Sequence, residues 1–336
     1  MSTDELLTQP TFTLGVTLGD PSGIGPELVV HTLTDERAPR VPIRLYGDRQ
    51  VLDEVQLRLG KRLAAQVELV PVSSLKSWQP GRPNAEGGAA QIAYLEAAVA
   101  DARGGRISAL CTAPIHKASC LAAGFAFPGH TEFLRERLGA ERVTMMFAGP
   151  RLRVSLATIH LALSAVPAAL TVEDLAGTIV QTAEALQRDF GVAAPRIAVA
   201  GLNPHAGEAG HFGDEELRIV TPAIARARQL LSSATASVTA TVTGPHVPDA
   251  VFRDHLDGRY DAVVALYHDQ GLIPVKLIDF EEAVNVTLGL PIVRTSPDHG
   301  VAHDIAGIAG STGIRTTSFA AALGLAVRLA SIRQSR

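Results

Sequence analysis

The chain reads LRVSLATIH at residues 152–160, IAVAGLNPH at 197–205 and AVVALYH at 262–268. Each stretch runs from an apolar, β-branched segment to a histidine, and segments of this kind predict buried strands of a parallel sheet. In an open α/β sheet, the loops at the carboxyl ends of the strands converge on the ligand crevice. We therefore expect the three terminal histidines to lie at the ligand-binding edge of a sheet.

Imidazole is a good ligand for zinc and similar divalent cations. Histidines at three strand ends, His160, His205 and His268, therefore predict a catalytic metal site with an open position for substrate. Each histidine alone is also compatible with an ordinary polar residue in a strand-to-helix loop. His211 follows in the same loop as His205 and is an alternative ligand, but His205 stands directly after the strand.

Strand-like and helix-like segments alternate along the rest of the chain. The expected strands also include 12–18, 41–46, 109–112 and 238–243, and the expected helices are 26–34, 51–59, 89–102, 131–138, 171–189 and 215–230. This alternation predicts an α/β fold with a mostly parallel, helix-covered sheet. A chain of 336 residues suits two lobes, although no stretch of its composition marks a linker.

Composition excludes several classes of protein. The apolar content of 46% and the charged content of 19% are typical of a globular protein, and a net charge of −4 without a basic cluster gives no footprint for nucleic acid. The first residues, MSTDELLTQPTF, are acidic and do not predict a secretory signal, and no apolar stretch has the length of a membrane span. The two cysteines lack CxxC spacing and predict reduced thiols in a cytoplasmic protein.

Two further stretches point to an anion. Gly129, His130 and Thr131 precede a predicted helix and offer imidazole, hydroxyl and backbone donors, although Thr131 is equally suited to be a simple N-cap. Lys117 lies close in sequence and favours the anion. Arg294 stands in an apolar segment and needs an anionic partner, either a ligand or a structural salt bridge.

Three loops remain. GDPSGIGPE, at 19–27, is either a ligand loop or a structural turn. In YHDQG, at 267–271, Asp269 is placed to orient His268, support a metal or take a proton. DHGVAHDIAG, at 298–307, suits a second ligand loop, whose ligand the residues alone do not identify.

Together these motifs resemble the 4-hydroxythreonine-4-phosphate dehydrogenase family of vitamin B6 biosynthesis. The resemblance begins near Phe12 and rests on nine motifs in family order: GDPSGIGPE, TAPIHK, GHTEF, ATIHL, NPHAGE, YHDQG, NVTLGLP, RTS and DHGVAHDIAG. The ends are also similar to the metal-dependent decarboxylating dehydrogenases, of the isocitrate and isopropylmalate dehydrogenase type. This implies a two-lobed α/β/α fold, with 1–128 and 290–336 on the cofactor side, 129–289 carrying metal, substrate and dimer contacts, and the active site in the cleft between the lobes.

The resemblance implies NAD(P)-dependent, metal-dependent oxidation of 4-phosphooxy-L-threonine at C3. The product, 2-amino-3-oxo-4-phosphooxybutanoate, would lose CO2 to give 3-amino-2-oxopropyl phosphate. The implied metal ligands are the three strand-end histidines, with zinc preferred over magnesium or cobalt, in a site shared across a homodimer. The implied substrate-binding residues are His130, Thr131, Lys276, Asn285 and Arg294, and the implied cofactor-binding residues are His299, Gly300, Ala302 and Asp304.

Asp249 and Asp269 are candidates for proton handling, whereas His116, within TAPIHK, receives no role. Other activities stay open at this point. A D-threonate or D-erythronate 4-phosphate dehydrogenase would keep the same phosphate residues, and an aromatic cis-dihydrodiol dehydrogenase would share the NPHA and HDQG loops. A zinc hydrolase or a two-lobed binding protein without turnover would need no dinucleotide. The sequence does not separate NAD from NADP.

Overall fold

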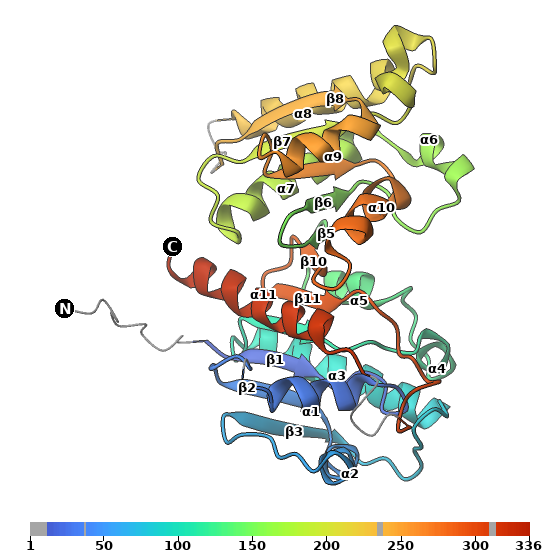
Figure 1. The fold of residues 1–336 in the computed structure, drawn as a ribbon, viewed down its shortest axis with the longest axis vertical. Coiled ribbons are helices and arrows are strands. Elements are labelled where there is room, and N and C mark those ends of the chain that lie inside the picture. Colours follow the sequence, from blue (N-terminus) through green and yellow to red (C-terminus); the bar gives the residue numbers. More distant parts are fainter. Residues whose placement is uncertain (1–11, 37, 234–237, 309–313) are drawn as a thin grey trace, which may run out of the picture. The chain divides into compact units, whose positions relative to one another are not determined.

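The computed structural model describes residues 12–36, 38–233, 238–308 and 314–336, and the chain divides into two compact units (Figure 1). Unit 1 comprises Met1–Ala140 and Leu290–Arg336, and unit 2 comprises Glu141–Gly289. The start of the chain, for which no secretory signal is expected, lies outside the described residues up to position 11.

The first boundary lies at Ala140 rather than at 128, where the sequence analysis placed it. The physical reason is an aromatic cluster: the Phe133 ring lies 5.4 Å from that of Phe125 and 5.5 Å from that of Phe127, between ring centroids. These contacts hold residues 129–140 in unit 1. His130 and Thr131 therefore belong to the unit that contains Arg294.

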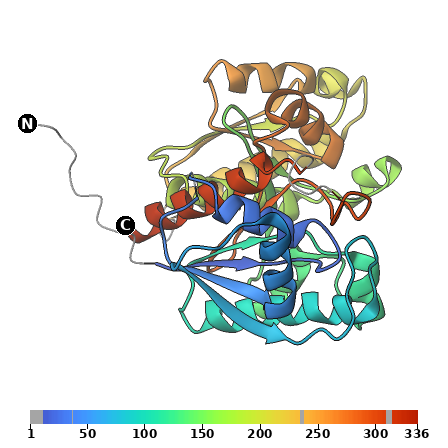
Figure 2. The ribbon, with the colours of Figure 1, turned by 60° about the horizontal axis from the view of Figure 1, so that its bottom comes forward.

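Unit 1 is built on parallel strands in the order β3-β2-β1-β4-β11. Every residue of β1 and β4 is buried, as expected for a parallel sheet covered on both faces. Figure 2 shows α3 on one side of the strands and α1 with α11 on the other. The elements are β1 (Leu14–Thr17), α1 (Gly25–Leu33), β2 (Ile43–Asp48), α2 (Arg49–Leu59), β3 (Val67–Ser73), α3 (Ala85–Arg103), β4 (Ala109–Thr112), α4 (Lys117–Ala122), α5 (His130–Arg137), β11 (Val293–Pro297) and α11 (Thr317–Gln334).

Unit 2 has strands in the order β10-β5-β6-β9-β7-β8. The β6–β9, β9–β7 and β7–β8 pairs are parallel, whereas β5 runs antiparallel to both β6 and β10. The elements are β5 (Thr144–Ala148), β6 (Arg153–Leu156), η1 (Leu163–Ala165), α6 (Val166–Ala169), α7 (Val172–Arg188), β7 (Arg196–Ala200), η2 (Pro204–Gly210), η3 (Glu216–Val220), α8 (Thr221–Leu231), β8 (Thr241–His246), α9 (Pro248–Leu256), β9 (Ala262–Ala265), α10 (His268–Asp279) and β10 (Val284–Leu288).

The core of unit 2 fixes the strand ends that carry the predicted histidines. Buried residues of β6 and β9 pack against Leu272 and Val275 of α10. Helix α10 begins at His268, directly after the strand end, so its packing against the sheet holds that histidine at the carboxyl edge. The α/β fold and the mostly parallel pairing predicted from the sequence are confirmed.

Among the described residues, no single helix has the length and apolar character to cross a membrane, and one bent pair, Leu163–Ala169 with Val172–Arg188, meets those criteria only jointly, across a bend of 93°.

Candidate active site

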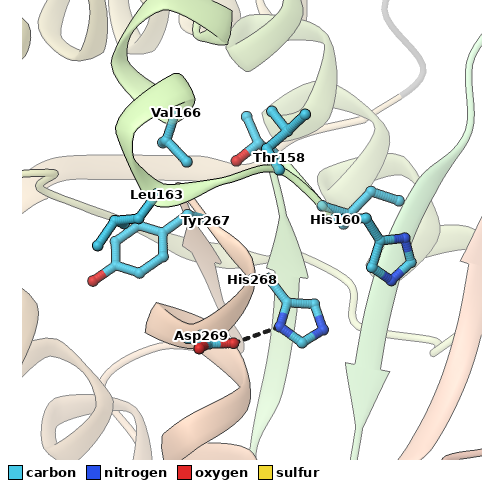
Figure 3. Close-up of a pocket in the computed structure, with 9 residues that line it drawn as sticks. Thr158, His160, Leu163, Val166, Tyr267, His268 and Asp269 are labelled. Atoms are coloured by element: carbon cyan, nitrogen blue, oxygen red, sulfur yellow. Dashed lines mark hydrogen bonds and ion pairs between the residues drawn. The ribbon is translucent and has the colours of Figure 1, made fainter.

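Two of the predicted metal ligands lie side by side in unit 2. Strands β6 and β9 are parallel neighbours, so the loops after them leave the same edge of the sheet. His160 follows the first strand and His268 the second, and their ring centroids are 5.7 Å apart with the ring planes at 40° (Figure 3). Both histidines line a pocket of about 370 Å³, together with Thr158, Ile159, Leu161, Leu163, Val166, Tyr267 and Asp269.

Asp269 orients one of these rings. Its Oδ1 lies 2.7 Å from Nδ1 of His268 (Figure 3). A carboxylate that accepts a hydrogen bond from one imidazole nitrogen fixes the ring and leaves the other nitrogen as a metal ligand. The side chain of Asp269 is largely exposed, so it also links His268 to solvent.

His205 lies on η2, in an unusual backbone conformation. Residues 205–209 all have positive φ, with His205 at 53°. Left-handed geometry costs roughly 1–2 kcal/mol for each residue other than glycine. His160 also has a positive φ, of 52°. Strain of this kind persists where surrounding structure over-determines it, and it concentrates at functional sites.

Glu216 accepts hydrogen bonds from the residues that begin this left-handed turn. Its Oε1 accepts hydrogen bonds from the backbone N–H groups of Leu202 and Asn203, both at 2.7 Å, and its Oε2 accepts from Nδ2 of Asn203 at 2.9 Å. Burial alone would raise the pKa of Glu216, but the hydrogen bonds from Asn203 and Leu202 outweigh it and hold the pKa below its ordinary value. Glu216 is not predicted from the sequence, because no local pattern links it to the loop that precedes it.

The three histidines do not converge within one chain. In the part of the chain that the structure describes, the ligand atoms of His160, His205 and His268 do not form a group within 4.8 Å of one another. The His160–His268 pair therefore offers two imidazoles to a cation, with His205 placed elsewhere in unit 2.

Unit 1 contains a group of basic side chains that we call the cationic cradle: Lys117, His130 and Arg294, of which Arg294 is buried and Lys117 exposed. His130 is the first residue of α5, whose N-cap is Gly129. Thr131 lies inside the helix, so its alternative role as a simple N-cap is wrong. A Cβ atom on Gly129 would stand 3.9 Å from Nζ of Lys117.

Arg294 is only 2% exposed, and its Nη2 donates to Oγ1 of Thr112 at 2.8 Å. Burial lowers the pKa of the Arg294 guanidinium to about 10, so it stays charged at neutral pH. Burial also lowers the pKa of His130 well below its usual value, and the charges of Arg294 and Lys117 lower it further. The buried Nε2 of His130 makes no hydrogen bond. Neighbouring cations and an unsatisfied imidazole nitrogen favour a bound anion.

The remaining predicted substrate and acid–base residues lie in unit 2. Lys276 is exposed on α10, and Asp249 is exposed in the first turn of α9. Asn285 is half-buried on β10, with its Oδ1 buried and without a hydrogen bond. These residues therefore belong to a different unit from the cationic cradle.

The 298–308 segment carries the predicted cofactor-binding residues His299, Gly300, Ala302 and Asp304 in unit 1. Ala302 has a positive φ of 44°. The carbonyl of Val301 accepts a hydrogen bond from the N–H of Ile24 at 2.9 Å, which fastens this segment to the GDPSGIGPE turn. Two motifs separated by most of the chain are therefore one structural feature.

The description of the matching family model is "Pyridoxal phosphate biosynthetic protein PdxA", and the match spans residues 32–326. A 4-hydroxythreonine-4-phosphate dehydrogenase of Desulfosudis oleivorans is 46% identical over 314 residues, covering 89% of this chain and 91% of that protein. The solved structure of a 4-hydroxythreonine-4-phosphate dehydrogenase from Klebsiella pneumoniae has a TM-score of 0.84 at 36% identity, over 95% of this chain and all of that one.

A terephthalate 1,2-cis-dihydrodiol dehydrogenase from Burkholderia xenovorans is also similar, with a TM-score of 0.66 at 31% identity over 96% of this chain and 98% of that one. The family model spans most of the chain, and the relatives match along nearly their whole length. This chain belongs to the pyridoxal phosphate biosynthetic protein PdxA family.

Proposed function

We propose that this protein is a dehydrogenase that oxidises 4-phosphooxy-L-threonine at C3 with NAD(P)+ and a divalent cation. The ketone product would lose CO2 to give 3-amino-2-oxopropyl phosphate. The observation that carries the proposal is the cationic cradle, because a buried arginine, a lysine and an imidazole at a helix N-terminus would suit a phosphate group. Relatives named 4-hydroxythreonine-4-phosphate dehydrogenase support the choice of substrate.

His160, His205 and His268 would hold the cation. Two imidazoles side by side, one of them oriented by Asp269, suit zinc or cobalt better than magnesium, which prefers oxygen ligands. When bound, the cation supplies Lewis acidity toward a hydroxyl or carbonyl oxygen, and NAD(P)+ accepts the hydride.

The protein's own side chains would bind and orient the substrate. Arg294, Lys117 and the first N–H groups of α5 would hold the phosphate, with Nε2 of His130 as a further donor. Thr131, Lys276 and Asn285 would contribute further substrate contacts. Anchoring one end of a small substrate lowers the entropic cost of aligning its reacting carbon.

Two further sets of residues would support the reaction. Asp269 would keep His268 in the tautomer that leaves one nitrogen for the cation and, with Asp249 as the alternative, would pass the hydroxyl proton to solvent. The segment with His299, Gly300, Ala302 and Asp304 would hold the dinucleotide. The two cysteines are buried and free, which supports a reducing, cytoplasmic location.

The test is NADH or NADPH formation by zinc-loaded protein with 4-phosphooxy-L-threonine, D-threonate 4-phosphate and D-erythronate 4-phosphate in parallel. We expect the amino acid to be oxidised with the highest kcat/KM. A higher kcat/KM for either sugar acid would make that compound the substrate, with the same oxidation at a carbon that bears a hydroxyl group. No reduction of dinucleotide with any of the three would overturn the proposed activity.

We also propose that the working form is a homodimer. Ile273 and Leu277 of α10 and its C-cap residue Phe280 are 67%, 79% and 66% exposed, at the spacing of one helix face in the helix that begins at His268. Contiguous apolar surface of this kind is typical of an interface. The separation of the three histidines within one chain further supports a cation site completed by a second copy.

Pairwise mixing of inactive variants tests the shared site. His160→Ala, His205→Ala and His268→Ala proteins would be refolded together, two at a time. If one histidine comes from the partner, the two mixtures that contain its variant should regain up to about a quarter of the wild-type activity, because random pairing gives half heterodimers with one intact site in two. The third mixture should stay inactive. Failure of all three mixtures would rule out a shared site.

A further inference from the structure

Unit 1 contains a group of potential metal ligands that the reaction does not use. Asp20, His116 and His303 place one ligand atom each within 4.8 Å of one another, and within the described ranges this is the one group of three or more that does so. Asp20 follows β1, His116 follows β4, and His303 lies on the 298–308 segment. The histidines proposed for the catalytic cation are all in unit 2.

Asp20 is fixed from both sides. Its side chain is 1% exposed, its Oδ1 accepts a hydrogen bond from the N–H of Ser22 at 2.9 Å, and its Oδ2 lies 2.7 Å from Nε2 of His303. Its backbone N–H donates to the carbonyl of Pro114 at 2.9 Å. Gly19 makes this approach possible: its φ is +70°, and a Cβ there would stand 2.4 Å from the Pro114 oxygen.

The two imidazoles are also held in place. Nδ1 of His116 lies 2.7 Å from Oγ of Ser119, and its backbone N–H donates to Oε1 of Gln91 at 2.8 Å. The rings of His116 and His303 meet edge to face, with centroids 4.7 Å apart and planes at 81°. The hydrogen bond between Ile24 and Val301 anchors the backbone that carries His303. The three ligands therefore come from three separately fastened segments.

A carboxylate and two imidazoles together form a ligand set that suits a divalent cation. A buried carboxylate is costly unless a cation or hydrogen-bond donors compensate its charge. A divalent cation would balance the carboxylate and use a lone pair from each imidazole. In the tautomer whose Nδ1–H donates to Oγ of Ser119, Nε2 of His116 keeps a lone pair for the cation, an arrangement common around metal sites.

We propose that Asp20, His116 and His303 form a second divalent cation site, of the zinc, cobalt or nickel class. Two histidines and one carboxylate are a recurrent protein ligand set for such ions, with water completing the coordination. A cation there would join the turn after β1, the start of α4 and the 298–308 segment. Because it would bind the folded chain and not the unfolded one, it would raise the melting temperature.

Cobalt binding tests this second site in a variant that lacks the proposed catalytic cation site of unit 2. The background would be the His160→Gln/His268→Gln variant, stripped of metal and titrated with Co²⁺ by calorimetry and visible absorption. We expect one equivalent per chain. Adding His116→Asn or His303→Gln should weaken Co²⁺ binding by about tenfold or more. His31→Gln, the same kind of change at a histidine of α1 outside the group, should leave it unchanged.

Absence of Co²⁺ binding by the background, or binding that neither His116→Asn nor His303→Gln weakens, would overturn the proposal. Anomalous diffraction from zinc-loaded crystals of the unmodified protein gives a second readout that needs no variant to fold. A zinc peak among Asp20, His116 and His303 supports the site, and peaks confined to unit 2 overturn it. Neither readout depends on dinucleotide reduction, so the result is independent of the proposed reaction.

Discussion

At the scale of single residues, burial sets the charge of the cationic cradle. His130 is kept neutral by burial and by two neighbouring cations, whereas Arg294 stays protonated despite its burial. A phosphate placed there would interact with fixed positive charge at low local dielectric, where each hydrogen bond to a charged group is worth about 1.5–3 kcal/mol. Lys117 is exposed on α4 and adds its ammonium group to the cradle beside Gly129, the N-cap of α5.

Replacing Lys117 with methionine removes one charge from the cradle and keeps a long side chain at that position. We expect KM for the phosphorylated substrate to rise about tenfold, because one charge-assisted contact is lost. Lys76→Met, at another exposed lysine of unit 1, serves as the control and should leave KM unchanged. Equal KM values for both variants and the wild type would remove Lys117 from the substrate site.

The cysteines give a second residue-scale prediction. Burial raises the pKa of both Cys111 and Cys120 to about 12. Because folding disfavours the thiolate, these groups should reduce the free energy of unfolding as pH rises above the ordinary thiol pKa of about 8.5. We expect neither thiol to react with Ellman's reagent in the native protein and both to react in urea. Rapid reaction of one thiol in the native state would contradict the burial.

At the scale of elements, a buried carboxylate supports the left-handed turn that carries His205. Glu216 sits on η3 and satisfies two backbone N–H groups at the start of that turn. All five residues after His205, 206–210, also have positive φ. The geometry of the turn therefore depends on external hydrogen bonds such as those to Glu216.

We expect Glu216→Ala to lower the free energy of unfolding by about 1–3 kcal/mol, because it leaves buried donors unsatisfied. It should also weaken Co²⁺ binding by the unit 2 histidines, while Glu216→Gln, which keeps an acceptor, should recover part of the loss. Glu173→Gln, at an exposed glutamate of α7, is the control. Urea unfolding measures the change in stability, and cobalt titration measures the change in metal affinity. Unchanged cobalt affinity in Glu216→Ala would show that metal binding does not depend on Glu216.

His255 links α9 to the sheet and makes stability depend on pH. Its Nε2 accepts a hydrogen bond from the backbone N–H of Arg153 at 3.2 Å, and burial lowers the pKa of its imidazole below the ordinary value. The unfolded chain therefore binds the proton more readily, and stability should fall as pH drops below about 6.5.

His255→Gln should flatten this dependence. Between about pH 7.5 and 5.5 the wild-type free energy of unfolding should fall more steeply than that of the variant, by at most about 1.4 kcal/mol per pH unit. His211→Gln, at an exposed histidine, should keep the wild-type slope. Parallel slopes for the wild type and His255→Gln would show that His255 is protonated equally in both states.

At the scale of the whole molecule, the proposed dimer would form through the exposed apolar side chains of α10. Leu277→Glu should shift the protein from dimer to monomer and abolish activity, because a charge cannot be buried there unpaired. Leu57→Glu is the matched control, since Leu57 is 83% exposed on α2 of the other unit. Analytical ultracentrifugation gives the oligomeric state. A Leu277→Glu dimer of unchanged affinity would place the interface elsewhere.

Several elements follow from local pattern, and others do not. The strand 109–112 matches β4, and the helix expected at 26–34 matches α1 within a residue or so, because apolar periodicity and helix-starting residues are local properties. Strands β5 and β10 were not predicted, since they pair antiparallel with partners that the sequence does not specify. The boundary at 128 was wrong because ring contacts of Phe133 hold α5 in unit 1.

The sequence by itself determined the α/β alternation, the histidines at strand ends and, through the order of its motifs, the family. Those features depend on residue types at fixed spacings along the chain. Only the tertiary structure decided that His160 and His268 lie together without His205, that Lys117 joins His130, and that Asp20 meets His116 and His303. These contacts depend on how turns after distant strands pack together. A backbone hydrogen bond such as that from Asp20 to Pro114 leaves no periodic signal in the sequence.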